Sequence, residues 1–499
     1  MSLKPLIAIC GTTGVGKSNL AIDLALQLAH GGFKSRWKGA RVINADSMQV
    51  YEGLDIITNK ITEDERRGVE HLLMGFKKPG EQYVVGDWVR DALELIDDIH
   101  DRNEIPIVVG GTSYWIQHLI FSNRLSRSES PLPIGNATAS EWPAELKESI
   151  GSLPPELLAM FNDPPCEPPS AKTEPEEAFK LHDLLSRLDP PIGARWHWRD
   201  TRKVLRSLRI IYETRRRASD IIAEQSSAVD LNKPRFRTLC FWLYADPLTL
   251  NSRLDERVDT MIKQGLLDEL YALHEISRVG QAQQLPDVDY TLGIYQAIGC
   301  KEFHDYLNTD VPSEKIFQDA VERMKLSTRQ YAKRQISWIR NKLLPAVYAS
   351  NEDQIMVPTY LLDATELGLS WTTNVREPAT RITQNFLEDD NLPDPYSLSE
   401  NAKKMLTIEQ KDTNPIATLE ARRKIICPIC TTREDQPVMM EEGEQWETHK
   451  KSKAHRRLSA KRQRREPGRD SRARDGCAKE EPKEEELVAT GSDTWCVVQ

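Results

Sequence analysis

Residues 7–25, IAICGTTGVGKSNLAIDLA, decide the fold class of this 499-residue chain. An apolar run ends in the pattern G-x-x-x-x-G-K-S, and a helical pattern follows it. A glycine-rich loop between a buried strand and a helix presents backbone N–H groups and a helix N-terminus to a phosphate. The stretch therefore predicts a phosphate-binding loop in an α/β protein.

Within this loop, the backbone N–H groups of residues 13–18 are predicted to wrap a diphosphate. Lys17 would contact its outer oxygens, and the Ser18 hydroxyl is placed to hold Mg²⁺. The predicted diphosphate-binding residues are Gly11, Thr12, Thr13, Gly14, Val15, Gly16, Lys17 and Ser18.

The rest of the chain predicts a phosphate-loop parallel sheet core, interrupted by a helical insertion and followed by a small C-terminal zinc finger. Short apolar runs alternate with helical patterns before the insertion, and RTLCFWLYA (237–245) returns to the sheet after it. The expected segments are the first part of the core (1–123), a Pro-rich loop and helical insertion (124–235), the second part of the core (236–345), an irregular linker (346–420), the finger (421–462) and a charged, disordered tail (463–499).

Bulk composition restricts the class of protein. The chain is 39% hydrophobic, and no apolar stretch approaches the roughly 18 residues that a membrane helix needs. The N-terminus runs straight into the first strand, so we expect no signal peptide or presequence. Eight scattered cysteines do not suggest a disulfide framework, which favours a reducing compartment.

The net charge of −9 hides a strong segregation of charge. From His449 to Arg474 there are 12 Lys and Arg residues against 2 acidic ones, and a second basic cluster lies at 199–217. Such segregation is typical of a surface that binds a polyanion. A solvated helix face and a basic tail are the alternative.

A carboxylate after the second predicted strand points to the chemistry. A phosphate-loop NTPase needs an acidic residue at the end of a second core strand, but IPIVVGG ends in Gly110, Gly111 and Thr112. Asp46 instead follows RVINA in a polar stretch, where it suits a general base, or else a helix N-cap. The combination favours a diphosphate that leaves from an allylic carbon.

Several motifs, in this order along residues 1–343, resemble the tRNA dimethylallyltransferase (isopentenyltransferase) family. The departures from the family pattern are Cys300 in an aromatic position and the Pro-rich interruption at 124–178. Besides the phosphate loop, the motifs are ADSMQVY (45–51), VGGTSYW (109–115), DTRKVLRSLRIIYE (200–213), LNSRLDERVDTMIKQGLLDEL (250–270), LGIYQAIGCKEF (292–303) and TRQYAKRQISWIR (328–340).

The resemblance implies transfer of a dimethylallyl group from dimethylallyl diphosphate to N6 of adenosine 37 in tRNA. An adenine must leave the base stack before its amine can reach a buried donor. Asp46 would be the general base, and Thr112 would line the tunnel in which the donor and the tRNA base meet. Arg257 would be a second phosphate ligand or, alternatively, part of an ion pair on the helix surface. The implied catalytic residues are Asp46, Lys17, Thr112 and Arg257.

The resemblance also implies a tRNA-binding set that grips the anticodon stem-loop. Solvated charges on a helix are the alternative for its basic members. Besides Asp46 and Thr112, the set comprises Ser47, Met48 and Gln49 at the flipped base and its neighbours, Arg202, Lys203, Val204, Leu205 and Arg206 in the insertion, and Arg329 and Lys333 near the RNA backbone.

A cysteine–histidine segment predicts a zinc site near the C-terminus. Cys427, Cys430, His449 and His455 have the spacing C-x2-C-x18-H-x5-H, which can close a tetrahedral Zn²⁺ site. The long gap is similar to that of RNA-associated matrin-type fingers. We expect the finger to add grip on tRNA through phosphates.

The tail contains two patterns that resemble signals for targeting or lipid modification. RRLSAKRQRR (456–465) fits nuclear import or further RNA contact, and the last four residues, beginning with Cys496, fit the prenylation pattern C-a-a-X. We expect a monomer in the cytoplasm, with nuclear and mitochondrial shares left open.

Three other functions remain open at this stage. They are a small-molecule kinase, a non-enzymatic RNA-binding protein with a vestigial loop, and an adenylate isopentenyltransferase that makes a cytokinin. The insertion and the finger favour a tRNA acceptor over a free adenylate, since a small acceptor needs no such clamp.

Overall fold

The computed structural model describes residues 3–31, 36–121, 142–227, 233–280, 290, 293–408 and 423–463. Two compact units divide the chain, residues 1–424 and 425–499. Among the described helices, none combines the length and the apolar character that a membrane span requires.

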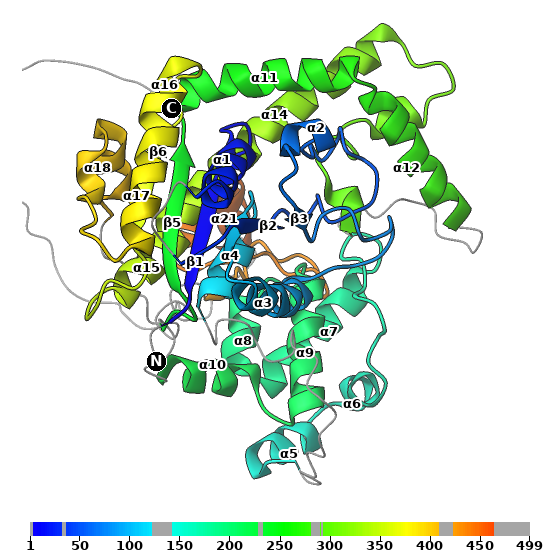
Figure 1. The fold of residues 1–499 in the computed structure, drawn as a ribbon. Coiled ribbons are helices and arrows are strands. Elements are labelled where there is room, and N and C mark those ends of the chain that lie inside the picture. The colour runs from blue at the N-terminus through cyan, green and yellow to red at the C-terminus, as the bar shows by residue number, and fades with distance from the viewer. Residues whose placement is uncertain are drawn as a thin grey trace, which may run out of the picture. The chain divides into compact units, whose positions relative to one another are not determined.

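The first unit is built on a six-stranded sheet in the order β3-β2-β4-β1-β5-β6, in which every pairing is parallel. The predicted parallel sheet is thus confirmed. The strands, which can be followed in Figure 1, are β1 (Pro5–Gly11), β2 (Ala40–Asn44), β3 (His71–Leu72), β4 (Ile105–Val109), β5 (Arg237–Tyr244) and β6 (Thr359–Asp363).

Alternate residues of β1 enter two separate hydrophobic cores. Leu6 and Ala8 pack with α3 and α4, whereas Ile7 and Ile9 pack with α1 and α17. Helices therefore cover both faces of the sheet, which explains why its central strands are continuously apolar rather than alternating. The covering elements are α1 (Lys17–Ala29), α3 (Val85–Asp101), α4 (Ser113–Ile120), α11 (Pro247–Lys263), α12 (Leu266–Gly280), α14 (Glu314–Trp338), α15 (Leu344–Ser350) and α17 (Glu377–Leu387).

The insertion between β4 and β5 is helical and has a hydrophobic core of its own. Leu181, Leu185 and Leu188 of α7 pack there against Val204 and Leu208 of α9. Its helices are α5 (Ala144–Gly151), α6 (Pro155–Asn162), α7 (Pro175–Leu188), α8 (Pro190–Arg195), α9 (Thr201–Thr214) and α10 (Ala218–Ser227).

The expectation of an irregular linker over 346–420 is wrong for its described part. Strand β6 extends the sheet beside β5, and Val375, Ala379, Ile382 and Phe386 form a buried stripe on the helical turns that follow. Strand β6 is only five residues long and directly follows Pro358, so sequence analysis did not identify a strand there. Besides α15 and α17, the helical elements of this segment are α16 (Leu369–Trp371), the π-helical turn η5 (Thr372–Arg376), the 3₁₀ turn η6 (Pro395–Ser397) and α18 (Glu400–Leu406).

Short elements complete the first unit. They are α2 (Glu63–Arg66), the 3₁₀ turn η3 (Gly293–Gln296), α13 (His304–Leu307) and the π-helical turn η4 (Ile339–Leu343). The second unit is described over 425–463. It contains a two-stranded sheet of β7 (Lys424–Ile426) and β8 (Met439–Glu441), followed by α20 (Glu444–Lys451) and α21 (Lys453–Gln463).

Candidate active site at the carboxyl edge of the sheet

The phosphate loop, residues 11–18, joins β1 to α1 and depends on two close approaches. A Cβ at Gly11 would lie 2.3 Å from the carbonyl oxygen of Leu243 in β5. Gly16 precedes α1 with a φ of 80°, and the Trp371 ring packs against it. Both positions therefore require glycine. Without side chains there, the loop backbone can also come close to a ligand.

The segment after β6 supports the loop from behind. Arg253 of α11 donates to the carbonyl oxygen of Gly14 at 3.3 Å and to those of Ala364 and Thr365 at 3.2 and 2.8 Å. Together with Trp371, these contacts make the segment from β6 to α16 part of the loop's structural support.

Two cations lie beside the loop. The Lys17 ammonium donates to the carbonyl oxygen of Thr12 at 2.6 Å, and Arg257 donates to the Thr13 hydroxyl at 3.0 Å. Burial lowers the pKa of Lys17 to about 8 and that of Arg257 to about 10, in each case against the attraction of Asp46. Both side chains are half-buried, and partly desolvated cations favour an anionic ligand, because a phosphate would replace their lost hydration.

Gln335 of α14 connects the phosphate loop to the end of β4. Its amide oxygen accepts from the Thr13 N–H at 2.9 Å, and its amide nitrogen donates to the carbonyl oxygen of Gly111 at 3.0 Å. The Thr13 N–H, predicted to face a diphosphate, is therefore already bonded here. Gln335 lies in the motif TRQYAKRQISWIR, but the sequence predicted a role only for two of its charged residues, Arg329 and Lys333.

Asp46 lies where the ends of β2 and β4 meet. The Ser47 N–H donates to the Thr112 hydroxyl at 3.1 Å, and an Asp46 carboxylate oxygen accepts from the Met48 N–H at 3.0 Å. Asp46 thus caps a tight turn rather than a helix. A Cβ at Gly110 would meet the carbonyl oxygen of Ala45 at 2.1 Å, so glycine permits this approach of the two strand ends.

A cavity of about 280 Å³ is lined both by Thr13 and Arg257, on the side of the phosphate loop, and by Asp46, at the end of β2. Tyr331 of α14, which sequence analysis missed, also lines it, and burial beside Asp46 raises the pKa of its hydroxyl. Gln296 also lines the cavity. The lining comprises Thr13, Asp46, Ser47, Met48, Ile57, Thr58, Leu254, Arg257, Val258, Met261, Gln296, Ala297, Ile298, Met324, Thr328, Tyr331 and Arg334.

A larger cleft, of about 1270 Å³, shares Ser47, Met48 and Gln296 with the cavity. The opposite wall belongs to the insertion, where α9 contributes Arg202, Leu205, Arg206 and Arg209, and aromatic side chains of Tyr83, Tyr114 and Trp115 lie on the core side. Cations beside aromatic rings suit single-stranded nucleic acid.

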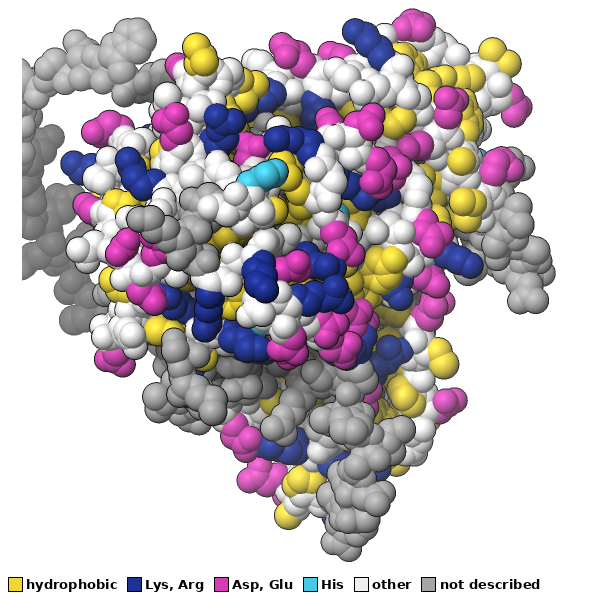
Figure 2. Space-filling view, in the orientation of Figure 1, with side chains coloured by type: hydrophobic (Ala, Val, Ile, Leu, Met, Phe, Trp, Pro, Cys, Tyr) yellow, Lys and Arg dark blue, Asp and Glu magenta, His cyan; other side chains and the backbone are white. Residues whose placement is uncertain are grey.

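On the face drawn in Figure 2, Lys and Arg side chains lie among acidic ones, so that face is not uniformly basic.

Comparison with known proteins then decides the family. The model of a family described as "IPP transferase" matches residues 49–342. The chain belongs to the IPP transferase family. The predicted family resemblance is thus confirmed.

Curated relatives and a solved structure extend this match. A tRNA dimethylallyltransferase of Schizosaccharomyces pombe is 36% identical, covering 91% of this chain and 94% of the relative. The human tRNA dimethylallyltransferase is 33% identical, covering 92% and 87%. A crystal structure of a eukaryotic dimethylallyltransferase acting on tRNA superimposes with a TM-score of 0.69 at 32% identity, covering 93% of this chain and 98% of that one.

The predicted tRNA-binding residues of α9 fall into two groups in this IPP transferase. Arg202, Lys203 and Arg206 are exposed, and Lys203 lies 3.5 Å from Asp200. Direct tRNA contact by Val204 is wrong, because its side chain is fully buried in the core of the insertion. Leu205 is also buried, although it reaches the wall of the cleft.

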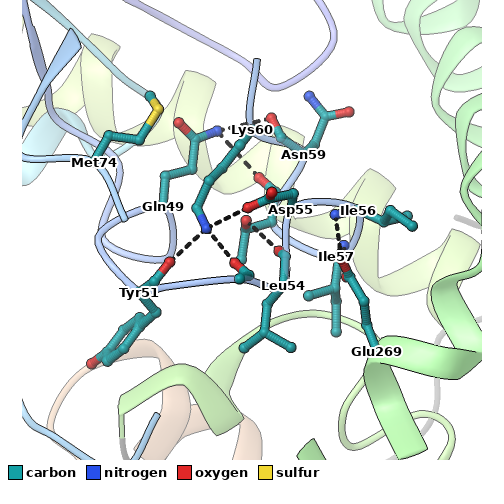
Figure 3. Close-up of polar contacts among 12 residues, drawn as sticks. Gln49, Tyr51, Leu54, Asp55, Ile56, Ile57, Asn59, Lys60, Met74 and Glu269 are labelled. Carbon is teal, nitrogen blue, oxygen red and sulfur yellow. Dashed lines mark hydrogen bonds and ion pairs between the residues drawn. The ribbon is translucent and has the colours of Figure 1, made fainter. Parts of the chain in front are cut away.

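Three other predicted contacts have definite surroundings. Arg329 forms an ion pair with Asp255 of α11, whereas Lys333 is exposed. Gln49 does not line the cavity or the cleft. Its amide nitrogen donates to the carbonyl oxygens of Thr58 and Asn59 instead (Figure 3).

The second unit brings its four predicted ligands together. The ligand atoms of Cys427, Cys430, His449 and His455 all lie within 4.8 Å of one another. Nδ1 of His455 is 3.5 Å from each sulfur and 3.0 Å from Nε2 of His449. Two thiols and two imidazoles at such distances fit one tetrahedral metal ion, and this donor set is typical of structural zinc.

Proposed function

We propose that the protein transfers a dimethylallyl group from dimethylallyl diphosphate to N6 of adenosine 37 in tRNA, giving isopentenyladenosine. One observation carries the proposal beyond the names of the relatives: a carboxylate, Asp46, shares a cavity with Thr13 and Arg257, next to Lys17. A group that removes a proton and groups that bind a diphosphate thus face the same small space.

In the proposed reaction, the adenine N6 attacks C1 of the dimethylallyl group as the bond from C1 to the diphosphate oxygen breaks. Negative charge grows on the departing diphosphate, where Lys17, Arg257 and the N–H groups at the start of α1 stabilise it. The nitrogen gains a carbon and sheds a proton, which Asp46 accepts. Mg²⁺ at the Ser18 hydroxyl would supply further positive charge to the diphosphate.

The large cleft supports a tRNA acceptor. Ser47 and Met48 line both the cleft and the cavity, so an adenine turned out of its stack would pass from one to the other. Thr112 holds Ser47 at this junction. The arginines of α9 and exposed Lys333 would then contact RNA phosphates.

We also propose that Zn²⁺ is the structural metal of the finger, and that the finger adds phosphate contacts to tRNA. The chain would act as a monomer in the cytoplasm, with nuclear and mitochondrial shares. Cys496, the prenylation candidate, and the end of the basic run lie outside the described residues.

Three incubations distinguish the candidate functions. The protein is mixed with Mg²⁺ and dimethylallyl diphosphate plus either an anticodon stem-loop or AMP, and separately with ATP alone. We expect isopentenyladenosine in the stem-loop, with little product on AMP and no ATP turnover. Product on AMP alone would identify an adenylate isopentenyltransferase, and ATP turnover without prenylation would identify a kinase-like enzyme.

A further inference from the structure

A loop between β2 and α2 forms part of the cavity wall without regular secondary structure. We call residues 46–60 the acceptor loop. Residues 55–59 make a single turn in which the Lys60 N–H bonds to the carbonyl oxygen of Asp55 at 2.9 Å. Ile57 and Thr58 of this turn line the same cavity as Asp46. The position of the turn therefore sets the shape of the space available to the nucleophile.

Glu269 of α12 holds this turn from outside the loop. Its two carboxylate oxygens accept from the Ile56 and Ile57 N–H groups at 2.9 and 2.8 Å, as Figure 3 shows. The first N–H groups of a helical turn have no partner within the turn. Hydrogen bonds to a charged acceptor are about twice as strong as neutral ones, and Glu269 supplies two across more than 200 residues of sequence.

Two further side chains tie the turn to the rest of the loop. The Lys60 ammonium donates to the carbonyl oxygens of Tyr51 and Gly53 and pairs with Asp55 at 2.8 Å (Figure 3). Its side chain is only 5% exposed. Gln49 bonds to the carbonyl oxygens of Thr58 and Asn59, as described above. The Gln49 N–H in turn donates to the carbonyl oxygen of Asp46 at 3.2 Å, so a displacement of the turn would be passed through Gln49 to Asp46.

Helix α12, which carries Glu269, follows directly on α11, which contacts the phosphate loop. Arg257, which contacts the phosphate loop, lies on α11, and Glu269 lies in the first turn of the adjoining α12. We infer that Glu269 is a positioning residue for prenyl transfer: it holds the turn at 55–59, and through it the acceptor wall of the cavity, in register with the diphosphate site. This inference rests on the proposed function for the identity of the reaction.

The test uses the full-length protein with three substitutions. Glu269→Ala removes both acceptors, Glu269→Gln keeps one, and Asp268→Asn removes a carboxylate from an exposed neighbour on the same helical turn as the matched control. Amide hydrogen exchange over residues 54–60 is measured alongside kcat and the two KM values, and thermal melting is recorded for each variant.

We expect Glu269→Ala to speed exchange of the Ile56 and Ile57 amides at least tenfold and to lower kcat by roughly 10- to 100-fold, since small misplacements cost rates of that order. KM for dimethylallyl diphosphate should change less than twofold, because Arg257 and the phosphate loop are untouched. Glu269→Gln should lie between Glu269→Ala and the unmodified protein, and Asp268→Asn should match the unmodified protein.

Unchanged exchange or unchanged kcat in Glu269→Ala would overturn the inference. So would equal losses in kcat and in affinity for dimethylallyl diphosphate, which would indicate a general structural role. If Glu269→Ala does not fold, the same comparison is made with Glu269→Gln. Absence of prenylation by the unmodified protein would instead refute the proposed function, while the exchange data would still decide whether Glu269 holds the turn.

Discussion

The phosphate loop and the acceptor loop line one cavity but are stabilised in different ways. In the phosphate loop, glycines at fixed positions of a short motif, Gly11 and Gly16, permit close packing against β5 and the Trp371 ring. The acceptor loop depends on Lys60, Gln49 and the distant Glu269, which bond to its backbone. Both loops therefore use partners from distant parts of the chain, such as Arg253 and Gln335 at the phosphate loop, but only the phosphate loop also carries a short motif that identifies it in the sequence.

Replacing Asp46 should give the largest difference between the effect on catalysis and the effect on diphosphate binding. Asp46→Asn keeps the size of the side chain but removes the proposed general base, and such a base contributes about 10²- to 10⁴-fold to a proton-transfer step. We expect kcat for stem-loop prenylation to fall by that order while the Kd for pyrophosphate, measured by calorimetry, stays within a fewfold. An equal loss in pyrophosphate binding would place Asp46 on the donor side instead.

Arg257 should give the opposite pattern. Arg257→Ala removes a half-buried cation and its hydrogen bond to Thr13, and charge-assisted hydrogen bonds contribute roughly 1.5–3 kcal/mol. We expect pyrophosphate to bind about 10- to 100-fold more weakly and the Kd for the stem-loop to be nearly unchanged. Arg329→Ala is the control, because this arginine pairs with Asp255; a larger effect there than at Arg257 would contradict the assignment.

Lys17 makes donor binding depend on pH. Its pKa is lowered to about 8, so the ammonium is present at pH 7 and is lost as the pH rises through 8. Since only the charged form attracts the diphosphate, we expect pyrophosphate affinity to fall about tenfold between pH 7 and pH 9. Lys17→Met provides the reference, because it retains the ligand's own titration; identical pH profiles for the two proteins would exclude Lys17 as the titrating group.

Gly16 tests the packing of the phosphate loop. Gly16→Ala would place a Cβ 2.5 Å from the Trp371 ring at a φ of 80°, whereas Gly31→Ala has a similar φ of 71° and no neighbour within 4 Å. Left-handed strain costs about 1–2 kcal/mol in both. We expect chemical denaturation to give a lower free energy of unfolding for Gly16→Ala than for Gly31→Ala, by about 1–3 kcal/mol for overpacking. Equal losses would mean that Trp371 moves aside freely.

Metal removal should have the smallest effect on the core. Cys430→Ser, or a zinc chelator, would break the cluster at Cys427, Cys430, His449 and His455, and structural zinc sites fold with their metal. We expect loss of the folded second unit by NMR, an unchanged melting temperature for the first unit, and a modest rise in the stem-loop Kd. Melting of both units together would show that they depend on one another.

Sequence analysis found the residues that lie in short motifs and missed those that act through distant contacts. The phosphate loop, Asp46, Arg257 and the finger ligands lie in short motifs whose spacing carries their chemistry. Gln335 and Glu269 act on residues 322 and 212 or more positions away, and nothing in their neighbourhoods indicates such partners. Strand β6 was missed because its five residues, directly after Pro358, are too few to show a period. Val204 was misplaced because a motif match does not reveal which side of a helix is buried.

The central claim is that the phosphate loop and Asp46 serve two reactants within one cavity. A crystal structure with an anticodon stem-loop and a sulfur-bridged, unreactive analogue of dimethylallyl diphosphate tests it most directly. The account predicts the diphosphate on residues 13–18 beside Arg257, and the adenine N6 within hydrogen-bond distance of the Asp46 carboxylate. An adenine that stays stacked in the loop, or a diphosphate bound away from Lys17, would contradict it.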